Sequence, residues 1–301
     1  METLQTVEIK PFSHCTIAEA LEAWNKGFRD YYTPIELSAD QLISRMGQMG
    51  LSPDYSFVAF DQGEPVGIIL NAIKRINGKK RAWNGGTSVA VNYRSLGVGR
   101  VLVNKTLELY KKEGVDSASL EAFSVNKKAI RLYERCGYKF QDTLLFFEHK
   151  GAMPDNVFKA SKVFSKHYGI PHEAGQLSFY DSEVPWQTRW NFLCSGESVI
   201  VKNDLQKEIG YAIYQRRFNE DGKLSAVVLY QCKVSETEDN KQEILLNLLN
   251  EVFPPGISYH KTTYNLPSSN ELLIHLLEKA EFKEAAAPNG TPLKQAFMVF
   301  E

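Results

Sequence analysis

The sequence has few cysteines, almost no net charge and no long apolar run, and each absence argues against a class of protein. Its four cysteines are scattered over 301 residues, with no CxxC pair and no metal-like spacing to histidine. This pattern argues against a disulfide framework or a zinc site, so no metal is expected. The 35 basic residues nearly balance the 36 acidic ones, so bulk charge favours neither nucleic acid nor a membrane surface as a partner.

The absence of an apolar leader and of spanning segments indicates where the protein works. Its first residues, METLQTVEIKPFSH, lack the basic and then apolar regions of a signal peptide. No stretch approaches the roughly 20 apolar residues that cross a bilayer. Scattered cysteines without a disulfide pattern are also typical of the reducing cytoplasm. We therefore expect a cytoplasmic protein without a membrane partner.

The hydrophobic residues are sufficient for a sizeable core. They make up 43% of the chain, and the length favours two domains over one. The segment Gly151-Ala-Met-Pro154 combines turn-forming residues. We therefore expect one domain at residues 1–150 and a second at 151–301.

The first half shows a regular succession of helical and strand patterns. Helices are expected at 16–28 and 38–49, the second with Ser38 as cap and Gln41 three residues later. Strands are expected at 56–62, 64–76 and 81–91, the last two joined by an Asn77-Gly78 hairpin. A helix, a strand, another helix and a final strand or pair follow at 100–112, 116–123, 126–137 and 138–149. The fold class is α+β, with a mixed, largely antiparallel sheet flanked by helices.

The stretch NYRSLGVGR places two glycines and flanking arginines between a strand and a helix. Without side chains, Gly97 and Gly99 would let backbone N–H groups face an anion at the positive end of the helix. A dinucleotide fingerprint fails because Leu102 stands where a small residue is needed, and a P-loop fails because no Lys-Ser/Thr follows Gly99. An ordinary glycine turn remains the alternative to a phosphate site.

The segment that follows makes the phosphate interpretation more specific. Strand, RxxGxG, amphipathic helix and strand are followed by LEAFSVNKKAIRLYERCGYKF. At these spacings the chain resembles the GNAT superfamily of N-acetyltransferases over most of residues 1–150. The resemblance implies acetyl-CoA as co-substrate. The backbone from Val89 to Val91 would lie along its pantetheine arm, and the loop from Arg94 to Arg100 would wrap around its pyrophosphate. The implied cofactor-binding residues are Val89, Ala90, Val91, Arg94, Ser95, Leu96, Gly97, Val98, Gly99, Arg100 and Asn126.

The same resemblance assigns catalytic roles. Tyr133 matches the tyrosine that protonates departing CoA, and a phenol with a pKa near 10 is protonated at neutral pH. Glu121 matches a glutamate assigned as base, although water relayed through backbone carbonyls remains an alternative. A strand amide near Val89 or Ala90 would stabilise the oxyanion. The alternative to these catalytic roles is that Tyr133 is an aromatic residue of the core and Glu121 an exposed charged residue on a strand.

The acceptor site is expected in the loop between the first two helices, FRDYYTPIELS. Acceptor specificity in the superfamily generally comes from this loop. The candidate substrate-binding residues are Asp30, Tyr31, Tyr32, Glu36 and, on the third strand, Asn84. Ordinary solvated loop residues are the alternative.

The second half contains an echo of the first. SSNELLIHLLEKAEFKE aligns without a gap on SVNKKAIRLYERCGYKF, which places Asn270 on Asn126 and Leu277 on Tyr133. The counterpart of the phosphate loop, VSETEDNKQ, has no glycine and three acidic residues that would repel a pyrophosphate. We expect a degenerate GNAT-like domain without a cofactor site, with a structural, substrate-shaping or homodimer-forming role. Chance similarity of two amphipathic helices is the alternative.

Two functions are compatible with the sequence. The first is an enzyme that transfers an acetyl group from acetyl-CoA directly to a primary amine of a small molecule or peptide, in a ternary complex. The second is a non-catalytic protein that senses acyl-CoA or binds a partner. The presence of both Tyr133 and the glycine loop favours the enzyme.

Overall fold

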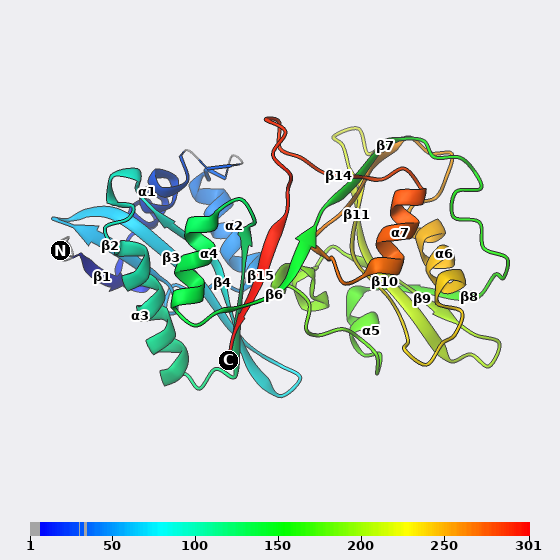
Figure 1. Ribbon diagram of the computed structural model, residues 1–301, viewed down its shortest axis with the longest axis horizontal. Helices are drawn as coiled ribbons and strands as arrows, with labels where there is room; N and C mark the ends of the chain where they lie inside the picture. The colour runs from blue at the N-terminus through cyan, green and yellow to red at the C-terminus, as the bar shows by residue number, and fades with distance from the viewer. Residues whose placement is uncertain (1–6, 30, 33–34) are drawn as a thin grey trace. The chain divides into compact units, whose positions relative to one another are not determined.

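A computed structural model describes residues 7–29, 31–32 and 35–301, and the chain forms two units (Figure 1). Unit 1 comprises Met1–Gln141 and Ala296–Glu301, and unit 2 comprises Asp142–Gln295. The sequence pattern placed the boundary after residue 150, whereas the structure divides the chain earlier. The reason is that the strand β7 (Phe147–Gly151) pairs within unit 2.

Unit 1 opens with a strand, not with the helices that the sequence favoured. This strand, β1 (Glu8–Pro11), pairs antiparallel with β2 (Phe57–Asp61). A short 3-10 helix, η1 (Phe12–His14), leads to α1 (Ile17–Phe28) and α2 (Ala39–Met49). Both α-helices begin with capping boxes, which confirms the predicted cap at Ser38.

The predicted meander of strands is confirmed. β2, β3 (Glu64–Ile76) and β4 (Lys79–Val89) pair antiparallel in sequence order. Asn77 and Gly78 have φ angles of 48° and 78°, the left-handed pair that closes a two-residue hairpin. This hairpin sets the register of β3 and β4, and therefore the point at which β4 reaches the candidate site.

The rest of unit 1 follows the predicted order of elements. They are η2 (Val91–Tyr93), α3 (Val98–Lys112), β5 (Ser117–Phe123), α4 (Lys127–Arg135) and β6 (Lys139–Leu145). β5 runs parallel to β4. Side chains of α3 and α4 share one apolar cluster with Ala82, Ala118 and Leu120 of the two strands, while Trp24 of α1 packs with Phe28 on the other face.

The chain's two halves exchange strands. The sheet of unit 1 contains β1-β2-β3-β4-β5-β15-β6 in this order, so the last strand, β15 (Gln295–Phe300), lies between β5 and β6 (Figure 1, red). β7 takes the corresponding place in the second sheet, whose order is β14-β7-β12-β11-β10-β9-β8. The predicted final strand pair at 138–149 is therefore two strands that enter different sheets.

Unit 2 repeats the plan of unit 1, as its sequence echo predicted. Its strands are β8 (Ser165–Gly169), β9 (Glu197–Lys202), β10 (Glu208–Phe218), β11 (Leu224–Val234), β12 (Tyr259–Thr263), β13 (Leu266–Pro267) and β14 (Lys283–Glu284). Its helices are α5 (Pro171–Gly175), η3 (Trp186–Thr188), η4 (Trp190–Phe192), α6 (Lys241–Val252) and α7 (Glu271–Lys279). β12 runs parallel to β11, as β5 does to β4.

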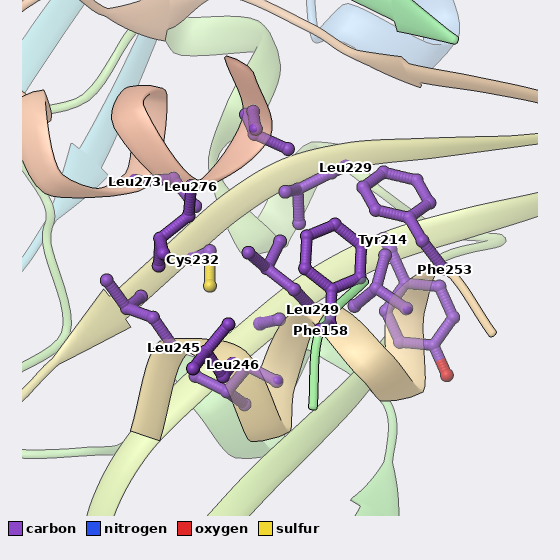
Figure 2. Packing of buried hydrophobic residues seen from close by; sticks show 14 of the residues in the cluster. Phe158, Tyr214, Leu229, Cys232, Leu245, Leu246, Leu249, Phe253, Leu273 and Leu276 are labelled. Atoms are coloured by element: carbon purple, nitrogen blue, oxygen red, sulfur yellow. The ribbon is translucent and has the colours of Figure 1, made fainter. Parts of the chain in front are cut away.

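The core of unit 2 lies between its sheet and the helices α6 and α7. Figure 2 shows Leu245 and Leu249 of α6 near Leu276 of α7 and Leu229 of β11. Cys232 belongs to the same cluster, and burial raises the pKa of its thiol to about 12. This cysteine is therefore a small buried apolar side chain, not a reactive thiol.

Candidate functional site

β4 and β5 separate near the middle of the sheet of unit 1. Their parallel pairing runs from Arg81↔Ser117 to Asn84↔Leu120, although β4 continues to Val89 and β5 to Phe123. A register shift against β3 leaves Gly85 as a β-bulge at the same point. The strands therefore form a splay in which backbone groups of β4 lack ladder partners on the β5 side.

One of the two amides predicted for the oxyanion is already engaged. The amide of Ala90 donates to the carbonyl of Val66 at 2.8 Å. Because successive residues of a strand direct their N–H groups to opposite edges, the amide of Val89 faces the β5 side, into the splay. Val89, and not Ala90, is therefore the residue that can donate to an oxyanion there.

The glycine loop leads into the positive end of α3. Gly97 caps the helix with φ of 90°, and Ser95 has φ of 66°. The first intrahelical bond that starts at the cap runs from the Val101 amide to the Gly97 carbonyl. The amides of Val98, Gly99 and Arg100 precede it and have no acceptor within the helix. These N–H groups and the dipole of a 15-residue helix fit a phosphate group.

Arg94 makes contacts that the sequence did not indicate. Its Nε donates to the Val89 carbonyl at 3.1 Å, and its Nη2 donates to the Gly27 carbonyl at 2.9 Å. The guanidinium therefore ties the loop to the end of α1. Arg100, by contrast, is exposed beside the open amides.

Tyr133 lies on α4 with 7% of its surface exposed. Burial raises the pKa of its phenol to about 12, and hydrogen bonding with Thr87 and Asn84 acts in the opposite direction. Thr87 and Asn84 bond each other at 2.9 and 3.1 Å. Asn84 is thus buried on β4, the strand on which the sequence placed it, and lies beside the phenol of Tyr133. The phenol is a proton donor over the whole neutral range.

Asn126 links the acceptor loop to α4. Its side chain caps α4 by accepting from the Ala129 amide at 3.1 Å. It also hydrogen-bonds with Tyr31, an effect that opposes the burial that raises the pKa of Tyr31. The rings of Tyr31 and Tyr32 lie 5.7 and 6.3 Å from that of Phe123, at the end of β5. The structure thus brings two predicted acceptor residues to the mouth of the splay.

Glu121 is the first β5 residue after the last pair with β4. Its Oε2 accepts a hydrogen bond from the Trp83 indole at 2.8 Å. Trp83 stands opposite Ser119, so both Trp83 and Glu121 lie on the sheet face away from Ala82 and Leu120. The candidate base and the candidate acid therefore approach the splay from opposite faces of the sheet.

Two other predicted acceptor residues are not placed at this site. Glu36 is exposed, and no contact brings it to Tyr133 or Glu121. Asp30 lies outside the described residues.

Among residues 7–29, 31–32 and 35–301, no group of three His, Cys, Asp or Glu side chains could hold a metal ion, and no helix is long and apolar enough to cross a membrane.

The sequence missed Thr87, Trp83 and Arg45, which lie around the splay. For Trp83 and Thr87 the sequence signal is position, because Thr87 directly follows the Gly85-Gly86 pair and Trp83 stands two residues before it. Arg45 comes from α2, forty residues earlier, and donates to the Gly85 carbonyl at 2.8 Å.

The corresponding place in unit 2 is filled. β11 and β12 stop pairing after Leu229↔Thr263, and the buried Gln231 follows. Its amide donates to the Thr188 carbonyl at 2.8 Å, and its Oε1 accepts from the Tyr211 hydroxyl at 2.8 Å. Leu277, the counterpart of Tyr133, is wholly buried and apolar.

Comparisons with known proteins agree with this arrangement. The acetyltransferase (GNAT) family model matches residues 17–138. An uncharacterised N-acetyltransferase of Methanocaldococcus jannaschii is 28% identical over 147 residues, which are 47% of this chain and 64% of that protein. The chain thus spans less than two thirds of this relative's length.

Solved structures extend the likeness of fold to both units. A GCN5-related N-acetyltransferase from Anabaena variabilis superposes on 98% of this chain and 72% of its own, with a TM-score of 0.62 and 14% identity. A tandem GNAT protein from the clavulanic acid biosynthesis pathway covers 98% of both chains, with a TM-score of 0.56 and 12% identity. At these identities the likeness concerns the fold alone.

Proposed function

Because residues 17–138 form a GNAT acetyltransferase domain, we propose that the chain transfers an acetyl group from acetyl-CoA directly to a primary amine of a small molecule or peptide. The observation that carries the proposal is the buried Tyr133 phenol, with a pKa of about 12, at the point where β4 and β5 part. A phenol held protonated at such a place suits the release of a thiolate.

Residues of unit 1 would hold acetyl-CoA, which supplies the activated thioester. The amides of Val98, Gly99 and Arg100 are the donors for its diphosphate. The free edge of β4 up to Val89 suits the amide-rich pantetheine arm, because its backbone groups lack a ladder partner on that side. The Val89 amide would donate to the carbonyl oxygen as negative charge develops there.

Protons move in opposite directions on the two faces of the splay. Glu121, or a water molecule, takes a proton from the acceptor's ammonium, and the free amine attacks the thioester carbon. As the C–N bond formed, the C–S bond would break, Tyr133 would give its proton to the departing sulfur, and the remaining extra proton on the acylated nitrogen would pass to the Tyr133 phenolate, directly or through water. Because the phenol is a weaker acid than a thiol with a pKa near 8.5, this donation must accompany bond cleavage and not precede it.

Unit 2 would bind no CoA in this proposal. Its splay is filled by Gln231 and Tyr211, and the start of α6 is preceded by Glu236, Glu238 and Asp239. A pyrophosphate would meet negative charge there where unit 1 offers free amides.

The test is release of CoA thiol from acetyl-CoA by the full chain with a panel of amines. The panel should contain free amino acids, polyamines, aminosugars and peptides with free amino termini. Turnover with at least one amine, accompanied by acetylated product in the mass spectrum, is expected. Tight CoA binding without turnover on any amine would instead favour the acyl-CoA sensor.

A further inference from the structure

Arg45 joins α2 to the bulge that opens the splay. Its Nη2 donates to the Gly85 carbonyl at 2.8 Å. Gly85 is the first residue of β4 after the last pair with β5 and is also the bulged residue against β3. A backbone carbonyl at such a point needs a partner, and the guanidinium of Arg45 provides one from outside the sheet.

The same guanidinium packs against the aromatic side chains beside the candidate base. The Cζ atom of Arg45 lies 5.8 Å from the centre of the Trp24 ring and 5.9 Å from the centre of the Trp83 ring. Trp83 in turn donates its indole N–H to Glu121 at 2.8 Å. One side chain thus contacts both the bulge and the residue that orients Glu121.

We propose that Arg45 is a positioning residue for acetyl transfer, which acts through the Gly85 carbonyl and the Trp83 indole. This inference rests on the proposed function. By holding the bulge, Arg45 keeps the edge of β4 apart from β5, and by stacking on Trp83 it fixes the direction in which Glu121 faces the splay.

The geometry explains why an arginine stands here. A planar guanidinium can donate along its edge while its face packs on indole rings. The ammonium of a lysine is a compact charge without a flat face, so it could satisfy the carbonyl or approach a ring but would not reproduce both contacts. Arg45→Lys is therefore expected to recover only part of the function lost in Arg45→Met.

Kinetics of the full chain test the inference. We expect Arg45→Met to lower kcat about 10- to 100-fold, the scale of a misplaced catalytic group, with CoA affinity within about threefold because the α3 amides are untouched. Arg75→Met is the matched control, because Arg75 also donates to a glycine carbonyl, that of Gly78, but at the distant hairpin.

A double-mutant cycle adds a readout that a merely structural role would not move. Arg45→Met combined with Trp83→Phe should cost little more in kcat than Arg45→Met alone, because Trp83→Phe removes a contact to Glu121 that Arg45→Met already disturbs. Additive losses, or an Arg45→Met that behaves like Arg75→Met, would overturn the inference.

Hydrogen exchange tests the same inference without turnover. In Arg45→Met, amides at residues 83–87 should exchange faster than in the parent chain, while Arg75→Met should leave them unchanged. Unaltered exchange at 83–87 contradicts a role for Arg45 in holding the bulge. If Arg45→Met shows this effect but the parent chain transfers no acetyl group, the proposed function is refuted and the role of Arg45 in holding the bulge stands.

Discussion

Both units carry a β-bulge at the same point, but they fill it with different residues. In unit 1 the parallel pairing ends at Asn84, and Gly85 and Gly86 follow; in unit 2 it ends at Leu229, and Tyr230 and Gln231 follow. The register against the preceding strand shifts at both places. The comparison shows that the two units share this frame and differ in the volume of the side chains that follow it.

The glycines of unit 1 cannot be replaced without moving their neighbours. A Cβ on Gly85 would lie 2.7 Å from the Leu51 side chain, and one on Gly86 would lie 2.6 Å from the Trp24 ring. Gly86 also has a φ of 155°. In unit 2, Gln231 instead fills the place with side-chain atoms and hydrogen bonds them to Thr188 and Tyr211. The two units therefore differ at this point by two adjacent residues, glycines in unit 1 and larger side chains in unit 2.

The largest expected effect concerns the residue that most clearly separates the units, Tyr133 against Leu277. Tyr133→Phe removes the proton donor but keeps the ring, so kcat should fall by about 10²- to 10³-fold, the usual range for a general acid. CoA affinity, measured by calorimetry, should stay within about threefold. Tyr168→Phe is the control, because Tyr168 lies exposed on unit 2 and its phenol also has a pKa of about 12. Equal activity of both variants would remove Tyr133 from the mechanism.

A buried lysine should affect stability in unit 2 without affecting the chemistry of unit 1. Lys261 is fully buried and donates to the carbonyls of Gly151, Ile257 and Tyr259. Lys261→Met leaves these carbonyls without that donor, so the free energy of unfolding should fall by roughly 2–4 kcal/mol. The exposed Lys150→Met on the neighbouring strand should change it by less than about 0.5 kcal/mol.

The pH dependence of that loss follows from the lysine's ionisation. Burial lowers the pKa of Lys261 from 10.5 to about 8. Between these values the unfolded chain holds a proton that the folded chain has lost, so this group makes stability rise with pH over that window. Denaturant titrations from pH 7 to 10.5 should show a steeper rise for the parent chain than for Lys261→Met. Parallel curves would contradict the shift.

A smaller effect is expected at the phosphate loop. Gly97 has a φ of 90°, so Gly97→Ala must strain or move the loop whose amides are to hold the diphosphate. Calorimetry should show CoA affinity about 10-fold weaker, equal to about 1.4 kcal/mol. Gly222→Ala is the matched control, with φ of 75° and open space around it in unit 2. If both variants bind CoA equally, the loop does not act as proposed.

The smallest expected effect is that kcat/KM does not fall at high pH. Because burial raises the pKa of Tyr133 to about 12, the acid stays protonated throughout the measurable range. The profile of kcat/KM should therefore rise as the acceptor loses its proton and show no fall up to about pH 10.5. An alkaline limb near pH 10 that disappears in Tyr133→Phe would show that the phenol is less buried during catalysis than in this structure.

Local features of the fold were predictable because neighbouring residues determine them. The Asn77-Gly78 hairpin and the capping box at Ser38 depend on a few adjacent residues, and both are present. The exchange of β7 and β15 was not predictable, because a strand pattern does not name its partner. Phe147–Gly151 is typical of a strand in either sheet, and the long-range pairing decides.

In the candidate site, too, local features were predictable from the sequence and long-range contacts were not. Tyr133, Asn126 and the glycine loop follow a spacing that the sequence displays, whereas Arg94 and Arg45 depend on where carbonyls of other segments lie. Arg94 bonds Gly27, far earlier in the chain, and no spacing predicts that contact. The sequence therefore indicates candidate residues for the chemistry more readily than it indicates the residues that hold them in place.

Hydrogen exchange of the full chain with and without CoA tests the central claim most directly. The account predicts slower exchange on CoA addition at the loop and first turn of α3, residues 94–101, and along the end of β4. Residues 235–243 of unit 2 should show no change. Protection at 235–243 in place of 94–101, or at neither segment, would contradict the claim that the open amides of α3 hold the diphosphate.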